Sequence, residues 1–214
     1  MNLFDLLDPA RGLDDTRRRL AGVAVGIVTN NKDPEGMGRV KVRFPWLSDE
    51  DESQWARIAV PMAGDGRGVY FLPEVDDEVL VAFGHGDPRL PYVVGALWNG
   101  QDAPPEDNAD GKNDVRVIRS RSGHQLRFDD SDAGPRVEIV DSGGNQIVVD
   151  TAADVITISA GKDVSIRAGS GKVRLEATKL EIDASADVKI KSGGQMQIEA
   201  GATLSLKGAL VNIN

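Results

Sequence analysis

The sequence predicts an all-β protein in which a small antiparallel barrel is followed by a rod of short repeated strands. Upstream of residue 100, short apolar strands alternate with turn residues and show no helical period. Small residues recur every eight positions from Ala153, whereas no proline follows Pro135 and no aromatic residue follows Phe128. We therefore expect an arm at 1–20, a barrel domain at 21–100, a linker at 101–113, neck strands at 114–150 and the rod at 151–214.

The arm is predicted to contain one or two short helices that pack on the chain's own barrel. Leu3, Leu6 and Leu7 form a small apolar stripe, and the stretch 9–12 with its proline and glycine interrupts it. The first eight residues are too acidic and too few for a signal peptide, and no stretch approaches 18 apolar residues. We expect the general secretion route to play no part in export.

The barrel is predicted from short strands separated by glycine, proline and aspartate. Five or six such strands in about 80 residues, with no helix between them, are typical of a small antiparallel barrel, and the OB-fold is the natural candidate. We expect strands near 21–29, 38–44, 55–60, 68–71, 78–83 and 92–97.

Charge and composition exclude several functions. The net charge is −9, and the excess acid lies upstream of Asp150 because residues 150–214 hold eight acids and eight bases. Such a surface repels phosphate backbones and anionic lipid, so we expect no nucleic-acid partner. The chain has no cysteine and therefore no disulfide or thiolate metal site. The acidic run at 49–52 lacks the spacing of a calcium loop and indicates a solvated hairpin loop.

The neck is predicted to hold four strands after a linker rich in proline, aspartate and asparagine. These strands are expected at 115–118, 125–128, 137–140 and 147–149, joined by glycine-containing turns. Their spacing is longer and less regular than that of the rod. We expect neighbouring chains to begin intertwining here.

The rod is predicted from an apolar, polar, apolar triplet in each eight-residue unit. This alternation places both large side chains on one face of a short strand, and the small residue allows a tight corner. The absence of proline and aromatic residues fits a thin shaft with a laddered backbone. The apolar pair is shifted by one position within its eight-residue unit at Val173 and Leu175, and again at Val211 and Ile213. The paired residues are Ile156 and Ile158, Val164 and Ile166, Val173 and Leu175, Leu180 and Ile182, Val188 and Ile190, Met196 and Ile198, Leu204 and Leu206, and Val211 and Ile213.

The apolar pairs also predict oligomerisation. One chain buries too little apolar area in so thin a rod to offset the entropy of ordering its backbone. Three chains around one axis would point every stripe inward, and we expect these pairs to form the core of a trimer. A one-chain prism with three units per coil stays open as an alternative.

Several motifs resemble those of one protein family. The segment Gly36-Met-Gly-Arg-Val-Lys-Val-Arg-Phe-Pro-Trp46 and the stretches 26–30, 55–61, 68–83 and 86–99 resemble the OB domain of contractile-tail spike proteins. That family includes the central spikes of phage baseplates, baseplate assembly protein V and the VgrG proteins of type VI secretion. The octad rod resembles the family's triple-stranded β-helix. The resemblance implies a homotrimer within a virion or extracellular injection particle, assembled in the cytoplasm, whose rod points toward the target cell envelope.

Departures from the family refine these expectations. Only a short arm precedes the barrel, so a separate hub protein is expected on that side. The linker leaves no room for the lysozyme domain that some phage spikes carry, so we expect no enzyme. His85 and His124 lie outside the rod, so we expect no metal site and no cofactor. A blunt end is expected to dock a PAAR-type tip protein through Leu210, Val211, Asn212, Ile213 and Asn214.

Two other classes of function stay open as alternatives. A trimeric adhesin or tail fibre would use its barrel to bind sugar near Trp46, Trp55 and Trp98, whereas we expect those rings to fill the barrel core. A monomeric β-helical polysaccharide lyase would need carboxylates and bases clustered on one face. The evenly mixed charges of the rod show no such cluster.

Overall fold

The computed structural model describes residues 22–48 and 50–212. The chain divides into two units, Met1–Asp163 and Val164–Asn214. The expected arm, Asp49 of the acidic loop, and Ile213 and Asn214 of the rod lie outside the described residues. Within the described part, no helix is long and apolar enough to cross a membrane.

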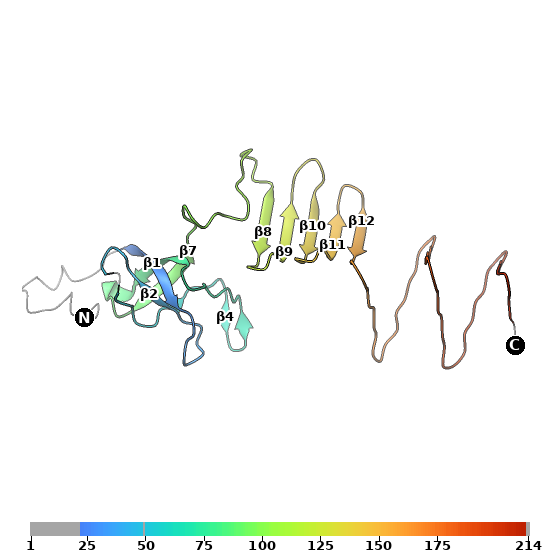
Figure 1. Ribbon diagram of the computed structural model, residues 1–214, viewed down its shortest axis with the longest axis horizontal. Coiled ribbons are helices and arrows are strands. Elements are labelled where there is room, and N and C mark those ends of the chain that lie inside the picture. The colour runs from blue at the N-terminus through green and yellow to red at the C-terminus, as the bar shows by residue number, and fades with distance from the viewer. Residues whose placement is uncertain (1–21, 49, 213–214) are drawn as a thin grey trace, which may run out of the picture. The chain divides into compact units, whose positions relative to one another are not determined.

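The first sheet curls on itself in the manner of an OB-fold (Figure 1). Its strand order is β2-β1-β6-β7-β3, with β3 parallel to β7 and the other neighbours antiparallel. An isolated bridge between Val40 and Ala56 links the segments next to β2 and β3, so the two ends of the sheet approach each other. This arrangement confirms the predicted OB-like class. The strands are β1 (Val23–Asn30), β2 (Lys41–Arg43), β3 (Arg57–Ile58), β6 (Glu78–Phe83) and β7 (Pro91–Ala96).

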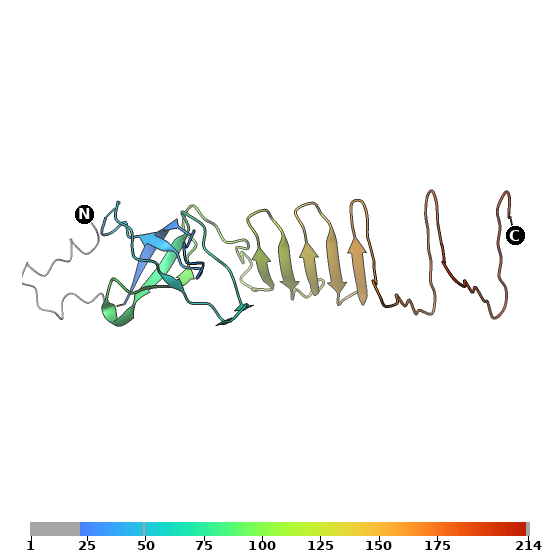
Figure 2. The same cartoon turned by 90° about the horizontal axis from the view of Figure 1, so that it is seen from below.

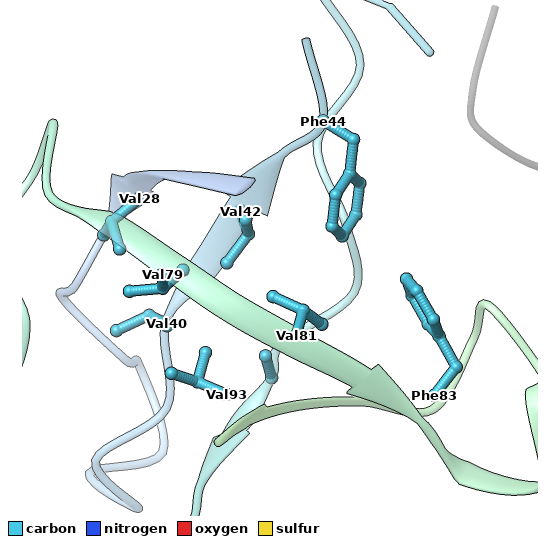
Figure 3. Packing of buried hydrophobic residues seen from close by; sticks show 9 residues of the cluster. Val28, Val40, Val42, Phe44, Val79, Val81, Phe83 and Val93 are labelled. Atoms are coloured by element: carbon cyan, nitrogen blue, oxygen red, sulfur yellow. The ribbon is translucent and has the colours of Figure 1, made fainter. Parts of the chain in front are cut away.

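The core of this sheet is built from alternate residues of its strands. In β6, Val79, Val81 and Phe83 are buried, and the residues between them face outward. Figure 3 shows these side chains converging with those of the neighbouring strands. The buried cluster consists of Val28, Val40, Val42, Phe44, Ala56, Val79, Val81, Phe83 and Val93.

The expectation that tryptophans fill this core is wrong. Trp46 is 55% exposed and Trp98 is 68% exposed. Trp55 is half-buried beneath two cations, with the guanidinium of Arg39 5.8 Å and the ammonium of Lys41 5.7 Å from its ring centroid. Valines and two phenylalanine rings already fill this narrow core, so the larger indoles remain outside.

The expected strand at 68–71 is also wrong. A small hairpin stands there instead, formed by β4 (Ala63–Gly64) and β5 (Arg67–Gly68). Gly68 has φ 150°, and a Cβ at this position would lie 2.5 Å from the Met62 carbonyl oxygen. The chain leaves the hairpin at once, and Tyr70 and Phe71 are exposed.

The second sheet is a simple antiparallel meander. Its strand order is β12-β11-β10-β9-β8, and Figures 1 and 2 show the five strands side by side in a single layer. The four predicted neck strands are confirmed, and the fifth contains the first apolar pair of the octad pattern. The strands are β8 (Val115–Arg119), β9 (Gln125–Asp129), β10 (Arg136–Val140), β11 (Gln146–Asp150) and β12 (Val155–Ser159).

Residues 160–212 form no strand pairing in the single chain. The backbone bends at intervals of about eight residues, and each bend lies at or beside one of the small residues that the octad pattern placed at corners. The β-helix itself stays a prediction. The bends occur at 161–162, 169–171, 178, 185–186, 193–194, 201–202 and 209–210.

Candidate functional site

The candidate site is one face of the second sheet. Because directly paired residues of an antiparallel sheet point to the same side, the register defines its rows. One row contains an aliphatic residue from each of the five strands. Two positions further along lies a second row, in which one polar residue stands among four apolar ones. The first row is Ile118, Leu126, Ile139, Ile147 and Ile158, and the second is Arg116, Phe128, Val137, Val149 and Ile156.

The opposite face of the sheet is mostly polar. The row between the two apolar rows is Val117, Arg127, Glu138, Val148 and Thr157. The outermost rows on this side contain Asp129, Arg136 and Asp150 at one end and Gln125 and Gln146 at the other. The sheet therefore has one apolar face and one polar face, as expected for a sheet with one side against a core.

Several side chains of the apolar face are more exposed to solvent than the charged side chains of the polar face. On the apolar face, Ile118 is 50%, Ile139 is 53% and Ile156 is 68% exposed. On the polar face, Asp129 is only 7% exposed, and Arg127 and Glu138 are half-buried. A row of exposed isoleucines without a second layer among the described residues is an apolar patch of the kind that marks interaction surfaces.

The polar face is stabilised by its own ion pairs. Arg136 lies 2.6 Å from Glu138 and 3.5 Å from Asp129, and Arg127 lies 3.8 Å from Asp129 and 3.9 Å from Glu106 of the linker. A hydrogen bond from Ser131, supported by the charges of Arg136 and Arg127, lowers the pKa of Asp129. These charged side chains of the polar face therefore find ion-pair partners within one chain.

The apolar face continues along the sequence into the rod. Ile156 and Ile158 belong to both, since they lie on β12 and form the first pair of the octad pattern. The pairs from Val164 to Val211 are exposed in the single chain, from 46% at Met196 to 71% at Ile166. The last expected core residue, Ile213, lies outside the described residues. The predicted trimer core is thus uncovered in one chain, and its role in a trimer stays a prediction.

Sequence reasoning missed the apolar residues of β8 to β11. The signal is present, because each of these strands carries the same triplet, with Arg116 and Ile118 as the one incomplete pair. The pairs Leu126/Phe128, Val137/Ile139 and Ile147/Val149 are separated by turns of unequal length, so they do not follow the octad. Only the antiparallel register brings them onto one face.

The other candidate residues do not gather into a site. Among the ring contacts of the described residues, none joins two tryptophans. His85 occupies a tight turn with φ 53°, and the Nδ1 of His124 accepts a hydrogen bond from the Ser142 amide at 3.2 Å. In the described ranges, no group of three metal-ligating side chains comes together. Of the expected tip-docking residues, Leu210, Val211 and Asn212 are exposed.

These features define the class of protein: an OB-like domain followed in sequence by an antiparallel sheet with an exposed apolar face. Residues 24–98 match the family described as the type VI secretion system/phage-baseplate injector OB domain. This segment therefore matches an OB domain of the phage baseplate V and VgrG type.

Type VI secretion spike proteins are similar over more of the chain. Spike protein VgrG3 of Vibrio cholerae is 34% identical over 105 residues, which cover 45% of this chain and 10% of the relative. VgrG4b of Pseudomonas aeruginosa is 31% identical over 140 residues, 54% of this chain and 17% of the relative. VgrG2a of the same organism is 28% identical over 189 residues, 82% of this chain and 21% of the relative. The last similarity extends well beyond the OB domain, yet this chain spans only a small part of each relative.

Proposed function

We propose that this chain is the central spike of a contractile injection machine and acts as a homotrimer. The observation that carries the proposal is the exposed apolar face of β8 to β12, which follows an injector OB domain and leads in sequence into the octad rod. In a trimer, the apolar face of each sheet would be buried against the equivalent faces of the other two chains.

The trimer core would begin at β8 and run through the octad pairs. In the neck, each chain would contribute one sheet as a wall, with the isoleucine row facing the axis and the ion-paired face outward. In the rod, each bend would carry the chain to the next wall, and strands would pair with those of the other two chains as a triple-stranded β-helix. Every backbone group would then have a partner, as a rod with few free edges requires.

The function is mechanical rather than catalytic. The OB domains would sit against a separate hub protein of the baseplate, and a PAAR-type tip protein would bind at Leu210, Val211, Asn212 and the two residues after them. When the sheath contracts, the rod would be driven through the target cell envelope. Cross-strand hydrogen bonding and a continuous aliphatic core would make it resist bending under that load.

The experiment that tests this function locates the chain in the particle. A tagged copy is expressed in the producing cell, and particles are isolated by gentle lysis and imaged by negative stain with a gold label on the tag. The label is expected at the baseplate end of sheathed particles, with a hub protein in the same fraction. A label on long fibres away from the tube axis would favour the tail-fibre alternative and contradict the spike.

A further inference from the structure

A groove opens beside the β4–β5 hairpin of the first domain, and we name it the hairpin groove. It has a volume of about 630 Å³ and is lined by the loop 36–38 and by the hairpin with the segment that follows it. A Cβ built on Gly38 would lie 3.5 Å from the Tyr70 ring, so these two walls approach each other closely. The larger side chains of the groove are Met37, Met62, Tyr70, Phe71, Arg57 and Arg67.

The composition of the hairpin groove is that of a protein-binding surface. Its two methionines and two aromatic residues are between 52% and 74% exposed. Aromatic residues, methionine and arginine are the residue types enriched at protein interfaces. Because the surface is concave, an extended segment fits it better than the convex surface of a folded domain.

The hairpin groove is also basic, although the whole chain has a net charge of −9. Among the described residues that line it, two are arginines and none is aspartate or glutamate. Within the described part of the chain, neither Arg57 nor Arg67 forms an ion pair with a carboxylate. The guanidinium of Arg57 lies instead 4.7 Å from the centroid of the Tyr92 ring. Two guanidiniums without a carboxylate favour an acidic occupant.

The linker contains a segment of the complementary chemistry. Residues 103–110 are exposed throughout and contain two prolines and three acids but no base. Segments with consecutive prolines bind aromatic-lined grooves well, because their extended conformation is ordered before binding. In the single chain, none of these residues lines the hairpin groove.

We infer that the hairpin groove of each copy binds residues 103–110 of a neighbouring copy, in the trimer of the proposed function, on which this inference rests. β1, β3 and β7 run in the same direction, since β1 and β7 are each antiparallel to β6 and β3 is parallel to β7. The groove contains residues that follow β1 and β3, and the linker follows β7, so both lie at one end of the domain. Fully extended, the linker at 101–113 reaches about 40 Å, whereas an 80-residue domain is roughly 30 Å across.

The chain's own linker starts on the other side of β7. The side-chain amide of Asn99 donates hydrogen bonds to Glu78 of β6 at 3.4 Å and to Asp102 at 3.2 Å, which holds the start of the linker next to β6. The groove is lined by Arg57 and Ile58 of β3, which pairs with the opposite edge of β7. The linker thus leaves away from its own groove. A contact between the groove of one copy and the linker of the next is head-to-tail, and three such contacts close a ring.

Cysteine crosslinking tests this contact, because the chain contains no cysteine. The full chain carries Met37→Cys in the groove and Ala109→Cys in the linker, and it is treated with a short bis-maleimide. The matched control carries Leu90→Cys with Ala109→Cys. Leu90 is 47% exposed and follows the far end of β6, roughly 20 Å from the groove. The Met37 pair should give at least about fivefold more covalent trimer on a denaturing gel than the control.

The other outcomes of the crosslinking overturn the inference. A crosslinked product with the mass of one chain would mean that the chain's own linker occupies the groove. Equal yields from the two pairs would mean that the linker moves freely. Light scattering on the untreated variants separates this failure from that of the proposed function. A trimer without the specific crosslink contradicts the groove contact alone, whereas a monomer contradicts the trimer as well.

Charge reversal in the crosslinking variant is a second test. Arg67→Glu should lower the yield of covalent trimer severalfold, because it places a carboxylate opposite the acidic linker. Adding Glu106→Arg and Asp107→Arg should recover most of that yield. Glu106 also lies 3.9 Å from Arg127 of its own chain, so Asp107→Arg is combined with Arg67→Glu separately to keep that contact. A yield that Arg67→Glu leaves unchanged, or that the reversed linker fails to recover, would contradict the inference.

Discussion

The same substitution, phenylalanine to alanine, can be compared at a buried and at an exposed position of the first domain, Phe44 and Phe71. Phe44 is 2% exposed and packs against Phe83 with a 5.6 Å separation of ring centroids, whereas Phe71 is 65% exposed. Phe44→Ala is expected to lower the free energy of unfolding by about 3–5 kcal/mol. Phe71→Ala should change it by no more than about 0.5 kcal/mol. Urea unfolding followed by tryptophan fluorescence measures both, and equal losses would show that the core is misassigned.

Asp33 makes the loop after β1 sensitive to pH. Its carboxylate accepts hydrogen bonds from the Arg39 side chain at 2.7 and 2.9 Å and from the amide of Met37 at 3.0 Å. The hydrogen bond from Arg39 holds the pKa of Asp33 well below its ordinary range. A depressed folded-state pKa stabilises the fold above the unfolded value of about 4, and this stabilisation is lost as pH falls toward the folded value.

Asp33→Asn should therefore lower the urea midpoint at pH 7. The difference from the natural chain should narrow as pH falls below about 4, because the natural chain then loses the same stabilisation. Urea titrations at pH 7, 5 and 3 measure the gap between the two proteins. A gap that stays constant across this range would rule out the ionised Asp33 as its source.

At the scale of elements, adjacent residues of β11 test which face of the second sheet is covered. Ile147 lies on the apolar face and is 42% exposed, whereas Val148 is half-buried on the polar face. In a lone chain Val148→Asp would be the more damaging change. If three chains close over the apolar face, Ile147→Asp instead places unpaired carboxylates in the trimer core.

We expect Ile147→Asp to weaken association by roughly a hundredfold or more, and Val148→Asp to leave the trimer intact. Sedimentation velocity over a dilution series measures the oligomer, and circular dichroism checks that both variants keep their strands. If Val148→Asp dissociates the protein and Ile147→Asp does not, the assignment of the faces is reversed.

Elements with clear alternation could be predicted from the sequence, and those without it could not. β6 lies where expected, and β8 to β11 begin and end within one residue of expectation, because apolar and polar residues alternate along them. The β4–β5 hairpin was missed, since two-residue strands carry no periodicity. The apolar face of the neck was missed for another reason: turns of unequal length hide the shared triplet until cross-strand register aligns Ile118, Leu126 and Ile139.

At the scale of the whole molecule, the single chain leaves its aliphatic side chains facing solvent along most of the sequence after residue 115. The described octad pairs are all exposed, and the bends at small residues supply the corners of a repeated strand without any strand to pair with. A balanced set of charges in the rod gives no electrostatic reason for the chains to stay apart. The proposed trimer would account for both the apolar pattern and the unpaired backbone.

The mass of the full chain in solution tests this account most directly. Light scattering coupled to size-exclusion chromatography, at micromolar concentration and physiological salt, should return three times the chain mass of 22.9 kDa. The same mass should persist on tenfold dilution, because the proposed core would run from the neck through the rod. A species of 22.9 kDa under these conditions would contradict the trimer, and with it the proposed spike.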